Sequence, residues 1–337
     1  MKTILTGIRA NSELHLGHYL GVILPMTRLV NKYSEDYNFN IFVPDLHSII
    51  SEIDGDLQHN ILRTIKYYIA AGLVLNKNVH IYRQSYVPAH SELCWILNCV
   101  ATMGETSRMT QYKEKSEGRE SCNVGIFDYP ILMAADILLY SAEYVPIGED
   151  QFQHIELTRN LATRFNHKFG EIFTVPAQTS EQVKFMGVSD GIRIRDLLNP
   201  EKKMSKSTKA ENSKIMLDDE PAKAAKKIMS ATTDSLEKVK FDMFNQPGIS
   251  NLLQIEALVN DRPLQDVISD WAGETRYGEL KKQVAASVST MLSNFQAKLS
   301  DINDDDIYAL FETGEKYANE VANKKLLEVQ RAVGLRA

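Results

Sequence analysis

The chain has 337 residues, 44% of them hydrophobic and 24% charged, which is ordinary for a globular protein with room for two or three packed units. Its net charge of −6 argues against indiscriminate nucleic-acid binding but leaves room for a local basic surface. No apolar run reaches membrane-spanning length and the N-terminus does not resemble a signal peptide, so we expect a cytoplasmic protein.

The first half of the chain alternates between strand and helix patterns. Strands are expected at 3–6, 38–44 and 78–82, and helices at 19–30, 57–73 and 89–103, with a kink at Pro25. Strands alternating with helices indicate a parallel sheet covered on both faces. We therefore predict an α/β fold with a Rossmann-like sheet, although the GxGxxG dinucleotide fingerprint is absent.

A short motif, His15-Leu16-Gly17-His18, follows the first expected strand and opens the first helix. Gly17 would let a nucleotide lie against the backbone at a helix N-terminus, and the two imidazoles could donate to phosphate oxygens. A chance pair of histidines near a helix start is the alternative.

Two further segments of the first half could line a site. Asp45-Leu46-His47 follows the second strand, at the end where open parallel sheets place ligands. The segment 108–119 is polar and basic. It is either a solvated surface segment or a cationic arm that approaches phosphates through Lys113 or Lys115.

The central stretch, 129–156, is the most informative part of the chain. At helical spacing Tyr129, Met133 and Asp136 share one face of an apolar helix. An unpaired buried charge is costly, so the carboxylate either has a structural partner or serves a ligand, and both readings stay open. A short strand at 144–147 and a helix from Gln151 to about 165 follow, so the carboxylate lies close to a strand-to-helix turn.

The rest of the chain changes character. A loop-rich connection is expected at 175–191 and a last short strand at 191–194, followed by a Lys/Ser loop, Lys203 to Ser207, that could carry ammonium groups onto a polyphosphate or simply be solvated. Helical patterns then occupy 221–230, 249–259, 264–272, 280–299 and 304–333. The last of them carries a modest basic patch of Lys324, Lys325, Arg331 and Arg336, a pattern more typical of a solvated helix face.

The HLGH at 15–18 and the KMSKS at 203–207, in this order on an α/β domain followed by helices, resemble the paired signatures of class I aminoacyl-tRNA synthetases. The stretch PILMAADILLYSAEYVPIGEDQFQHIELTRNLATRFN is similar to the tryptophanyl-tRNA synthetase family. The segments SRMTQYKEKS, VPAHSELCWIL and PGISNLLQI are similar to it as well. The resemblance covers essentially the whole chain and is thinner beyond Ala272.

The resemblance implies a role for each matching position. Asp136 would accept the indole N–H of tryptophan, with Gln151 at the α-amino end and Tyr129, Met133, His47 and Val145 shaping the pocket. The ATP site would comprise Arg9, Ala10, Asn11, Gly17, His18, Gly148, Glu149, Asp150, Ile194, Lys203, Met204, Ser205, Lys206 and Ser207. The catalytic groups would be His15, His18, Lys203, Lys206 and Lys115, the last with Gln111 nearby and close to the leaving pyrophosphate.

The implied activity is that of a tryptophan–tRNA ligase, which activates tryptophan with ATP and transfers it to tRNA. The resemblance also implies Mg²⁺ on the ATP, no structural metal, a homodimer and a tRNA that spans both subunits. We expect a catalytic domain at 1–200, the KMSKS loop at 201–210 and a helical tRNA-recognition region at 211–337, whose last helix could pack back on the catalytic domain.

The chain departs from the family pattern at several positions. Many members carry Asn at the position of His18 and a residue other than His at that of His15. Arg9 stands where Gln is usual, and Leu5 replaces an aromatic residue often found at the pocket floor. The segment 180–191 is longer than in many relatives and receives no role.

Three rival functions remain. Tyrosyl-tRNA synthetases share the architecture, but their pocket helix usually carries Gln-Ala-x-Asp where this chain has Met133-Ala134-Ala135-Asp136. Small nucleotidylyltransferases share HxGH but lack the KMSKS loop and the long helical region. A non-catalytic paralogue on the same fold is disfavoured because the histidines and lysines of both motifs are intact.

Overall fold

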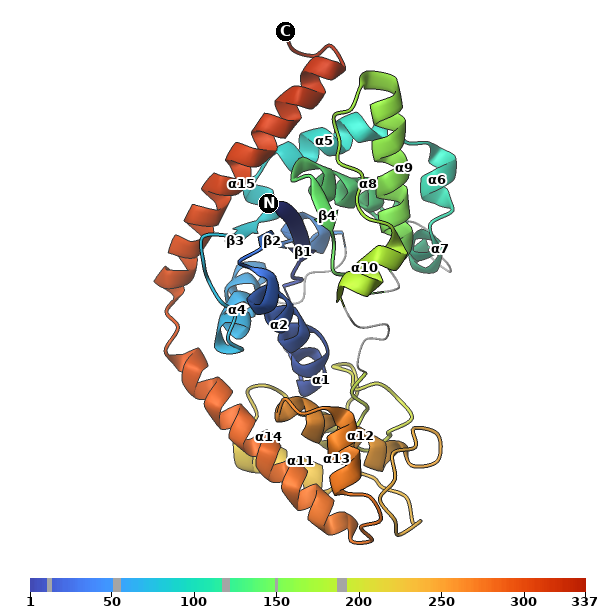
Figure 1. The fold of residues 1–337 in the computed structure, drawn as a ribbon, viewed down its shortest axis with the longest axis vertical. Helices are drawn as coiled ribbons and strands as arrows, with labels where there is room; N and C mark the ends of the chain where they lie inside the picture. The colour runs from blue at the N-terminus through green and yellow to red at the C-terminus, as the bar shows by residue number, and fades with distance from the viewer. Residues whose placement is uncertain (11–13, 51–55, 117–121, 149–150, 187–192) are drawn as a thin grey trace.

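The computed structural model describes residues 1–10, 14–50, 56–116, 122–148, 151–186 and 193–337. An upper part holds the sheet, and a lower part holds α11, α12 and α13 with much of α14 (Figure 1). The strands are β1 (Lys2–Gly7), β2 (Tyr37–Val43), β3 (Val79–Arg83) and β4 (Ala142–Tyr144). They form one parallel sheet in the order β3-β2-β1-β4.

Alternation along the strands divides the core into two layers. Ile4, Ile41 and Ile81 belong to one buried cluster, whereas Leu5, Phe42 and Tyr82 belong to the other. Because neighbouring strand residues point to opposite faces, both faces of the sheet are covered, as predicted. The parallel sheet and its surrounding helices confirm the predicted α/β class.

The helices of the upper part fit between and after the strands. They are α1 (Leu16–His18), α2 (Leu24–Tyr33), α3 (Asp45–Ser48), α4 (Leu57–Ala70), α5 (Ala89–Asn98), α6 (Met103–Ser107), α7 (Thr110–Ser116), α8 (Val124–Leu139), α9 (Phe152–Phe169) and α10 (Thr179–Met186). A 3-10 turn, η2 (Gln84–Tyr86), directly follows β3.

The helix kink predicted at Pro25 is replaced by an irregular turn just before this residue. A π-helical turn, η1 (Tyr19–Ile23), separates α1 from α2, and the amide of Leu24 bonds to the carbonyl of Tyr19, five residues back. Pro25 itself occupies the first turn of α2, where its missing N–H costs nothing. The single helix predicted for 19–30 is therefore a π turn followed by an α-helix.

Several predicted boundaries were wrong. The helix expected to reach residue 103 ends at Asn98, and α6 begins after a capping box in which Thr102 and Glu105 satisfy each other's amides. The polar segment 108–119 contains α7, and the strand expected at 144–147 is β4 at Ala142–Tyr144. The ends of these elements depend on capping hydrogen bonds and on tertiary contacts. Such interactions are difficult to predict from the local sequence pattern.

The connection expected at 175–191 contains a helix, α10. The buried side chain of Gln182 holds it in place: it accepts from the amide of Val145 at 2.9 Å and donates to the carbonyls of Glu143 and Ala177. The strand expected at 191–194 is absent from its described residues, 193 and 194. Arg195 instead forms an isolated bridge with Lys203.

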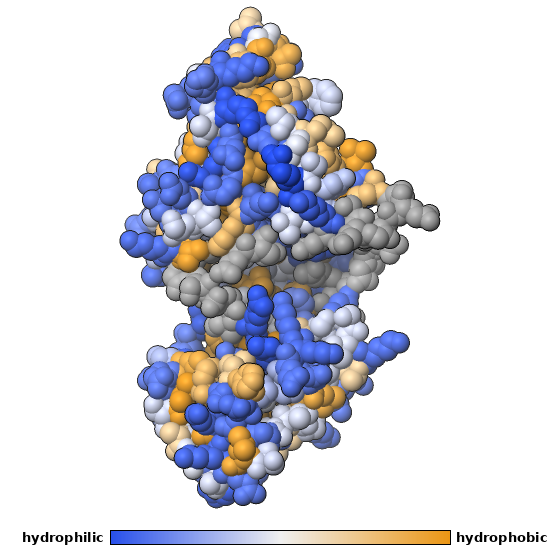
Figure 2. Space-filling model, turned by 90° about the vertical axis from the view of Figure 1, so that its right-hand side faces the viewer, coloured by the Kyte–Doolittle hydropathy of each residue, from blue (hydrophilic) through white to orange (hydrophobic). Residues whose placement is uncertain are grey.

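The helical region matches its predicted elements closely. It comprises α11 (Pro221–Met229), α12 (Pro247–Val259), α13 (Leu264–Asp270), α14 (Tyr277–Ser300) and α15 (Asp304–Ala332), with a 3-10 turn, η4 (Glu211–Ser213), before them. The long helices α14 and α15 run consecutively along one side of the molecule (Figure 1). The face seen in Figure 2 is largely hydrophilic, with hydrophobic residues in small separate patches.

The last helix, α15, returns to the sheet and packs on β3 (Figure 1). Arg83 donates to the Glu315 carboxylate at 2.6 and 3.1 Å in a buried pair. At Gly314 the helix approaches so closely that an added Cβ would lie 2.0 Å from the carbonyl oxygen of Ile81. The expected basic patch is partly engaged, since Lys325 bonds to Glu328 and to the carbonyl of Ile172.

All three cysteines are free; Cys94 is buried, Cys122 is partly buried and Cys99 is exposed. Among the described residues no helix is both long and apolar enough to cross a membrane.

We predict that Gly314→Ala destabilises the protein by ~1–3 kcal/mol, because a methyl group at this position must push α15 away from β3. Gly278→Ala is the matched control: its Cβ would meet nothing within 4 Å, so the change should be neutral or stabilise α14 by about 0.5–1 kcal/mol. Urea unfolding of the two variants measures the difference. Equal stabilities would contradict the close approach.

Candidate functional site

A cavity of about 540 Å³ opens where β1 and β2 end and α8 passes over them. Its lining contains all six residues predicted to bind tryptophan and one predicted for ATP: His47, Tyr129, Met133, Asp136, Val145, Gln151 and Arg9. Apolar side chains such as Leu5, Phe42 and Ile147 supply much of the rest. The carboxyl ends of parallel strands are the place where this architecture puts ligands.

Asp136 is the only fully buried acid among the described residues of the cavity wall. Gln84 Nε2 and His90 Nδ1 lie 2.7 and 2.6 Å from its Oδ1, and His47 Nε2 lies 2.9 Å from its Oδ2. Burial alone would raise the pKa of this carboxyl, but the hydrogen bonds from His47 and His90 outweigh it and lower the pKa to about 2. The carboxylate is therefore ionised at neutral pH.

Both interpretations of Asp136 left open by the sequence are visible in this geometry. The carboxylate has structural partners, and it also borders the cavity.

A second group of hydrogen bonds in the cavity wall involves Tyr129. Its Oη donates to Gln111 Oε1 at 3.1 Å and lies 3.2 Å from His154 Nε2. The cavity thus combines an apolar, aromatic wall with a few fixed polar groups, as small-molecule sites usually do.

The rings of the two histidines of the HxGH motif lie against each other at the start of α1, with centroids 3.8 Å apart and planes tilted by 30°. Burial, then the neighbouring His18, Lys203 and Lys214 charges, lower the pKa of His15 to about 3. Burial and the charges of Lys203 and Lys206 lower the pKa of His18. At neutral pH the motif therefore presents neutral imidazoles beside the lysines of the second motif.

Gly17 lies close to this pair of rings. An added Cβ would meet Cε1 and Nδ1 of His15 at 3.0 Å and Cβ of Ile194 at 3.6 Å. Packing against the His15 ring therefore favours glycine at this position, a reason that is independent of any nucleotide.

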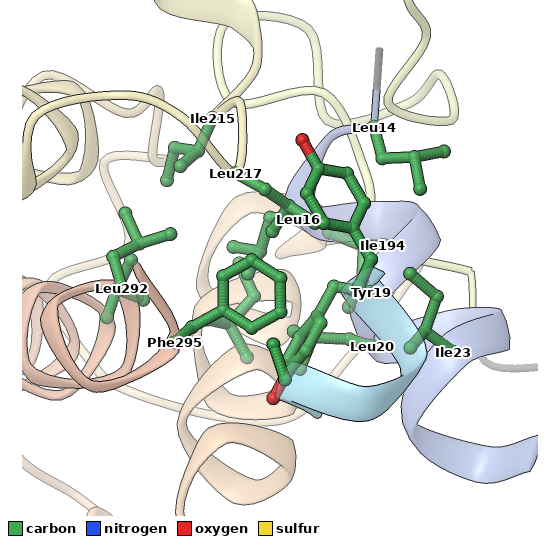
Figure 3. Packing of buried hydrophobic residues seen from close by; sticks show 14 of the residues in the cluster. Leu14, Leu16, Tyr19, Leu20, Ile23, Ile194, Ile215, Leu217, Leu292 and Phe295 are labelled. Carbon is green, nitrogen blue, oxygen red and sulfur yellow. The ribbon is translucent and has the colours of Figure 1, made fainter. Parts of the chain in front are cut away.

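Backbone pairing joins the HxGH segment to residues 215–217, which follow the KMSKS loop and are far away in sequence. The amide of Leu16 bonds to the carbonyl of Ile215 at 2.8 Å, and the amide of Leu217 bonds to the carbonyl of Leu14 at 3.0 Å. In Figure 3 the side chains of these residues lie close to Tyr19 and Phe295, whose rings have centroids 5.3 Å apart. One hydrophobic cluster thus holds the HxGH segment, the segment after KMSKS and α14 together.

The KMSKS loop is held at both ends. Met204 is 1% exposed and its amide bonds to the carbonyl of Ile194 at 3.0 Å. Lys214 Nζ donates to the carbonyls of Lys206 and Thr208 at 2.5 and 2.7 Å. Of the two lysines of the motif, Lys203 directly precedes the buried Met204 and is exposed, whereas Lys206 is half-buried.

The remaining predicted residues are distributed as follows. Ser205 and Ser207 share a hydroxyl hydrogen bond of 2.9 Å, and Ile194 is 1% exposed. Ala10 packs against the hydrophobic core, and Gly148 is exposed. Asn11, Glu149 and Asp150 lie outside the described residues, and so does the side chain of Lys115, whose backbone is in α7.

Sequence reasoning missed two partners of Asp136, namely Gln84 and His90. Gln84 directly follows β3, so the rule that drew attention to His47 after β2 would have found it. His90 lies in a segment noted for its family resemblance, but nothing in its spacing connected it with Asp136, 46 residues away.

Comparison with known proteins bears on both the fold and the site. Residues 1–293 match the family described as tRNA synthetases class I (W and Y). The chain belongs to this family. A tryptophan–tRNA ligase of Caldanaerobacter subterraneus subsp. tengcongensis is 42% identical over 336 residues, 99% of this chain and 99% of the relative. That of Bacillus subtilis is 41% identical over 336 residues, 99% of this chain and 98% of the relative.

A solved structure agrees with these relatives. The tryptophanyl-tRNA synthetase of Mycoplasma pneumoniae superimposes with a TM-score of 0.80 and 34% identity, covering 100% of this chain and 98% of that one. The predicted family membership, the predicted enzyme class of aminoacyl-tRNA ligase and the predicted tryptophan–tRNA ligase function are thereby confirmed.

The low pKa of His15 leads to a prediction about acid stability. Between pH 6.5, the ordinary histidine value, and about 3 the unfolded chain binds a proton that the folded chain does not. Stability should therefore fall as the pH drops through this range, with a slope that approaches about 1.4 kcal/mol per pH unit from this group alone. His15→Gln should reduce that slope.

Urea unfolding of the wild type and His15→Gln at several pH values between 7 and 5 measures the slope. Replacing the exposed His167 by Gln serves as the control and should leave the slope unchanged. A slope that is the same in wild type and His15→Gln would contradict a neutral, buried His15.

Proposed function

We propose that this member of the tryptophan–tRNA ligases binds tryptophan in the cavity around Asp136. The observation that carries this proposal is an ionised carboxylate in the wall of an otherwise largely apolar and aromatic cavity. Such a site suits a large aromatic side chain with one N–H donor. The full-length similarity to tryptophan–tRNA ligases supports the same substrate.

The residues that line the cavity would contact different parts of the tryptophan molecule. Asp136 accepts the indole N–H, while Tyr129, Met133, His47 and Val145 enclose the rings. Gln151, at the start of α9, holds the α-amino end, and Arg9 lies toward the ATP. A charged acceptor contributes about 1.5–3 kcal/mol net to such a hydrogen bond, and a ligand without the donor leaves it unpaired.

The chemistry requires positioning and neutralisation of charge. The carboxylate of tryptophan attacks the α-phosphate of ATP, the bond to the leaving pyrophosphate breaks, and tryptophanyl-adenylate forms. The nucleophile is already ionised, so no general base is needed. His15, His18, Lys203, Lys206 and Lys115, with Mg²⁺ carried by the ATP, stabilise the charge on the phosphates.

The nucleotide site extends from the cavity toward the two motifs. It comprises Arg9, Ala10, Asn11, Gly17, His18, Gly148, Glu149, Asp150, Ile194, Lys203, Met204, Ser205, Lys206 and Ser207. Support comes from the backbone pairing that joins the HxGH segment to the residues after the KMSKS loop. Further support comes from the Campylobacter jejuni tryptophanyl-tRNA synthetase, whose structure is described as complexed with ADP and tryptophan. It has 27% identity and a TM-score of 0.79, over 98% of this chain and 99% of that one.

Transfer of tryptophan to tRNA follows activation. We assign the catalytic domain to 1–200, the KMSKS loop to 201–210 and tRNA recognition to the helical region 211–337, in a cytoplasmic homodimer whose tRNA spans both subunits. The helices α11 to α14 support a separate recognition region, whereas α15 lies mainly against the sheet. Electrostatic binding of tRNA phosphates by such a region should weaken as salt rises.

The proposal predicts ATP–pyrophosphate exchange that depends on tryptophan. Phenylalanine should support little exchange, because it leaves the ionised Asp136 without a donor, and tyrosine presents its hydroxyl elsewhere. The measurement is exchange with each amino acid at matched concentrations, using the purified full chain. Exchange driven by tyrosine but not tryptophan would assign the chain to the rival specificity of the family.

A second prediction concerns Lys206. Lys206→Ala should slow activation by about 10²–10³, the usual effect of losing one preorganised electrostatic donor, with a smaller effect on tryptophan binding. Lys209→Ala removes an exposed lysine two residues beyond the motif and is the matched control. Pre-steady-state formation of the adenylate separates rate from affinity; a loss of tryptophan affinity at an unchanged rate would refute the assignment.

A further inference from the structure

His90 has no assigned role, although it is closer to Asp136 than any other donor among the described residues. It is completely buried, and its Nδ1 lies 2.6 Å from Asp136 Oδ1. His90 is not among the residues lining the cavity, so it acts on a ligand only through Asp136. The inference below rests on the proposed function.

The hydrogen-bond pattern fixes the proton on one nitrogen of His90. Because the ionised Asp136 can only accept, Nδ1 carries the hydrogen of the 2.6 Å bond between them. Nε2 of the same ring is then the acceptor for the hydroxyl of Tyr140, which lies 3.0 Å away. Tyr140 thus stabilises the tautomer that Asp136 requires.

Counting acceptors shows what remains for a ligand. A carboxylate offers about four acceptor positions. In Asp136 Gln84 and His90 occupy two on Oδ1, and His47 occupies one on Oδ2. The open position is on Oδ2, in a residue that lines the cavity. With three donors in place the carboxylate has room for a single further N–H.

We propose that His90, oriented by Tyr140, is a positioning residue that determines specificity by aiming the free acceptor of Asp136 at the indole N–H. Without the bond from Nδ1, Oδ1 regains an open acceptor position, and only the bonds from Gln84 and His47 hold the carboxyl group. A ligand N–H then meets a carboxylate that is no longer preorganised, and discrimination by that N–H weakens.

The test compares tryptophan with 3-benzothienylalanine, an isostere in which sulfur replaces the N–H. His90→Leu removes the donor at similar volume. His90→Asn retains it, because the Asn amide nitrogen can take the place of Nδ1. We expect the ratio of kcat/KM for tryptophan over the isostere to fall about 10- to 100-fold in His90→Leu, through KM for tryptophan. The ratio should return to within a few-fold of wild type in His90→Asn.

Three readouts separate positioning from a merely structural role. A general loss of folding would weaken tryptophan, the isostere and ATP together, whereas loss of positioning lowers the ratio and leaves KM for ATP unchanged. His80→Leu is the control. It removes a different imidazole, one that lies in β3, stacks on Tyr317 and is not part of the cavity wall. In His80→Leu the ratio of kcat/KM for tryptophan over the isostere should equal that of the wild type.

If His90→Leu does not fold, Tyr140→Phe decides the question, because it removes only the hydroxyl that stabilises the tautomer. We expect the ratio to fall about 3- to 10-fold in this variant. An unchanged ratio in Tyr140→Phe or in a folded His90→Leu overturns the inference. A wild type without tryptophan-dependent exchange refutes instead the proposed function, so the two failures are distinguishable.

Discussion

An ionised carboxylate in the interior of the protein is the constraint on which the site depends. Asp136 has no access to solvent, yet its hydrogen bonds hold its pKa at about 2. An unpaired charge in this place would cost several kcal/mol, so the surrounding elements must supply donors with accurate geometry. They come from α3, η2 and α5, which means that three separate segments must pack correctly before α8 can be accommodated.

The same constraint accounts for the position of the sheet relative to the cavity. His47 and Gln84 follow the carboxyl ends of β2 and β3, which are neighbours in the sheet. Parallel pairing brings these ends to one edge, and α8 lies across that edge with its acidic residue facing them. The strand order thus determines which donors reach Asp136, and no single segment could provide them alone.

Much of this arrangement could be predicted from the sequence, because periodicity and motif order report on fold class directly. The face shared by Tyr129, Met133 and Asp136 placed three cavity residues correctly. The partners of Asp136 could not be predicted from periodicity, since the bond to His90 depends on how α5 packs against α8. The same holds for α10, which is held by the buried side chain of Gln182 and by the stacking of Phe185 on Tyr144, and whose sequence has only a weak helical pattern.

The return of α15 to the sheet has a consequence for synthesis on the ribosome. Arg83 and Glu315 are 232 positions apart, so β3 emerges long before the helix that covers it. Until then the nascent chain exposes an unprotected edge strand and an unpaired Arg83, the kind of surface that invites association with other chains. The sheet can reach its final packing only late in translation, after α15 has emerged and can cover β3.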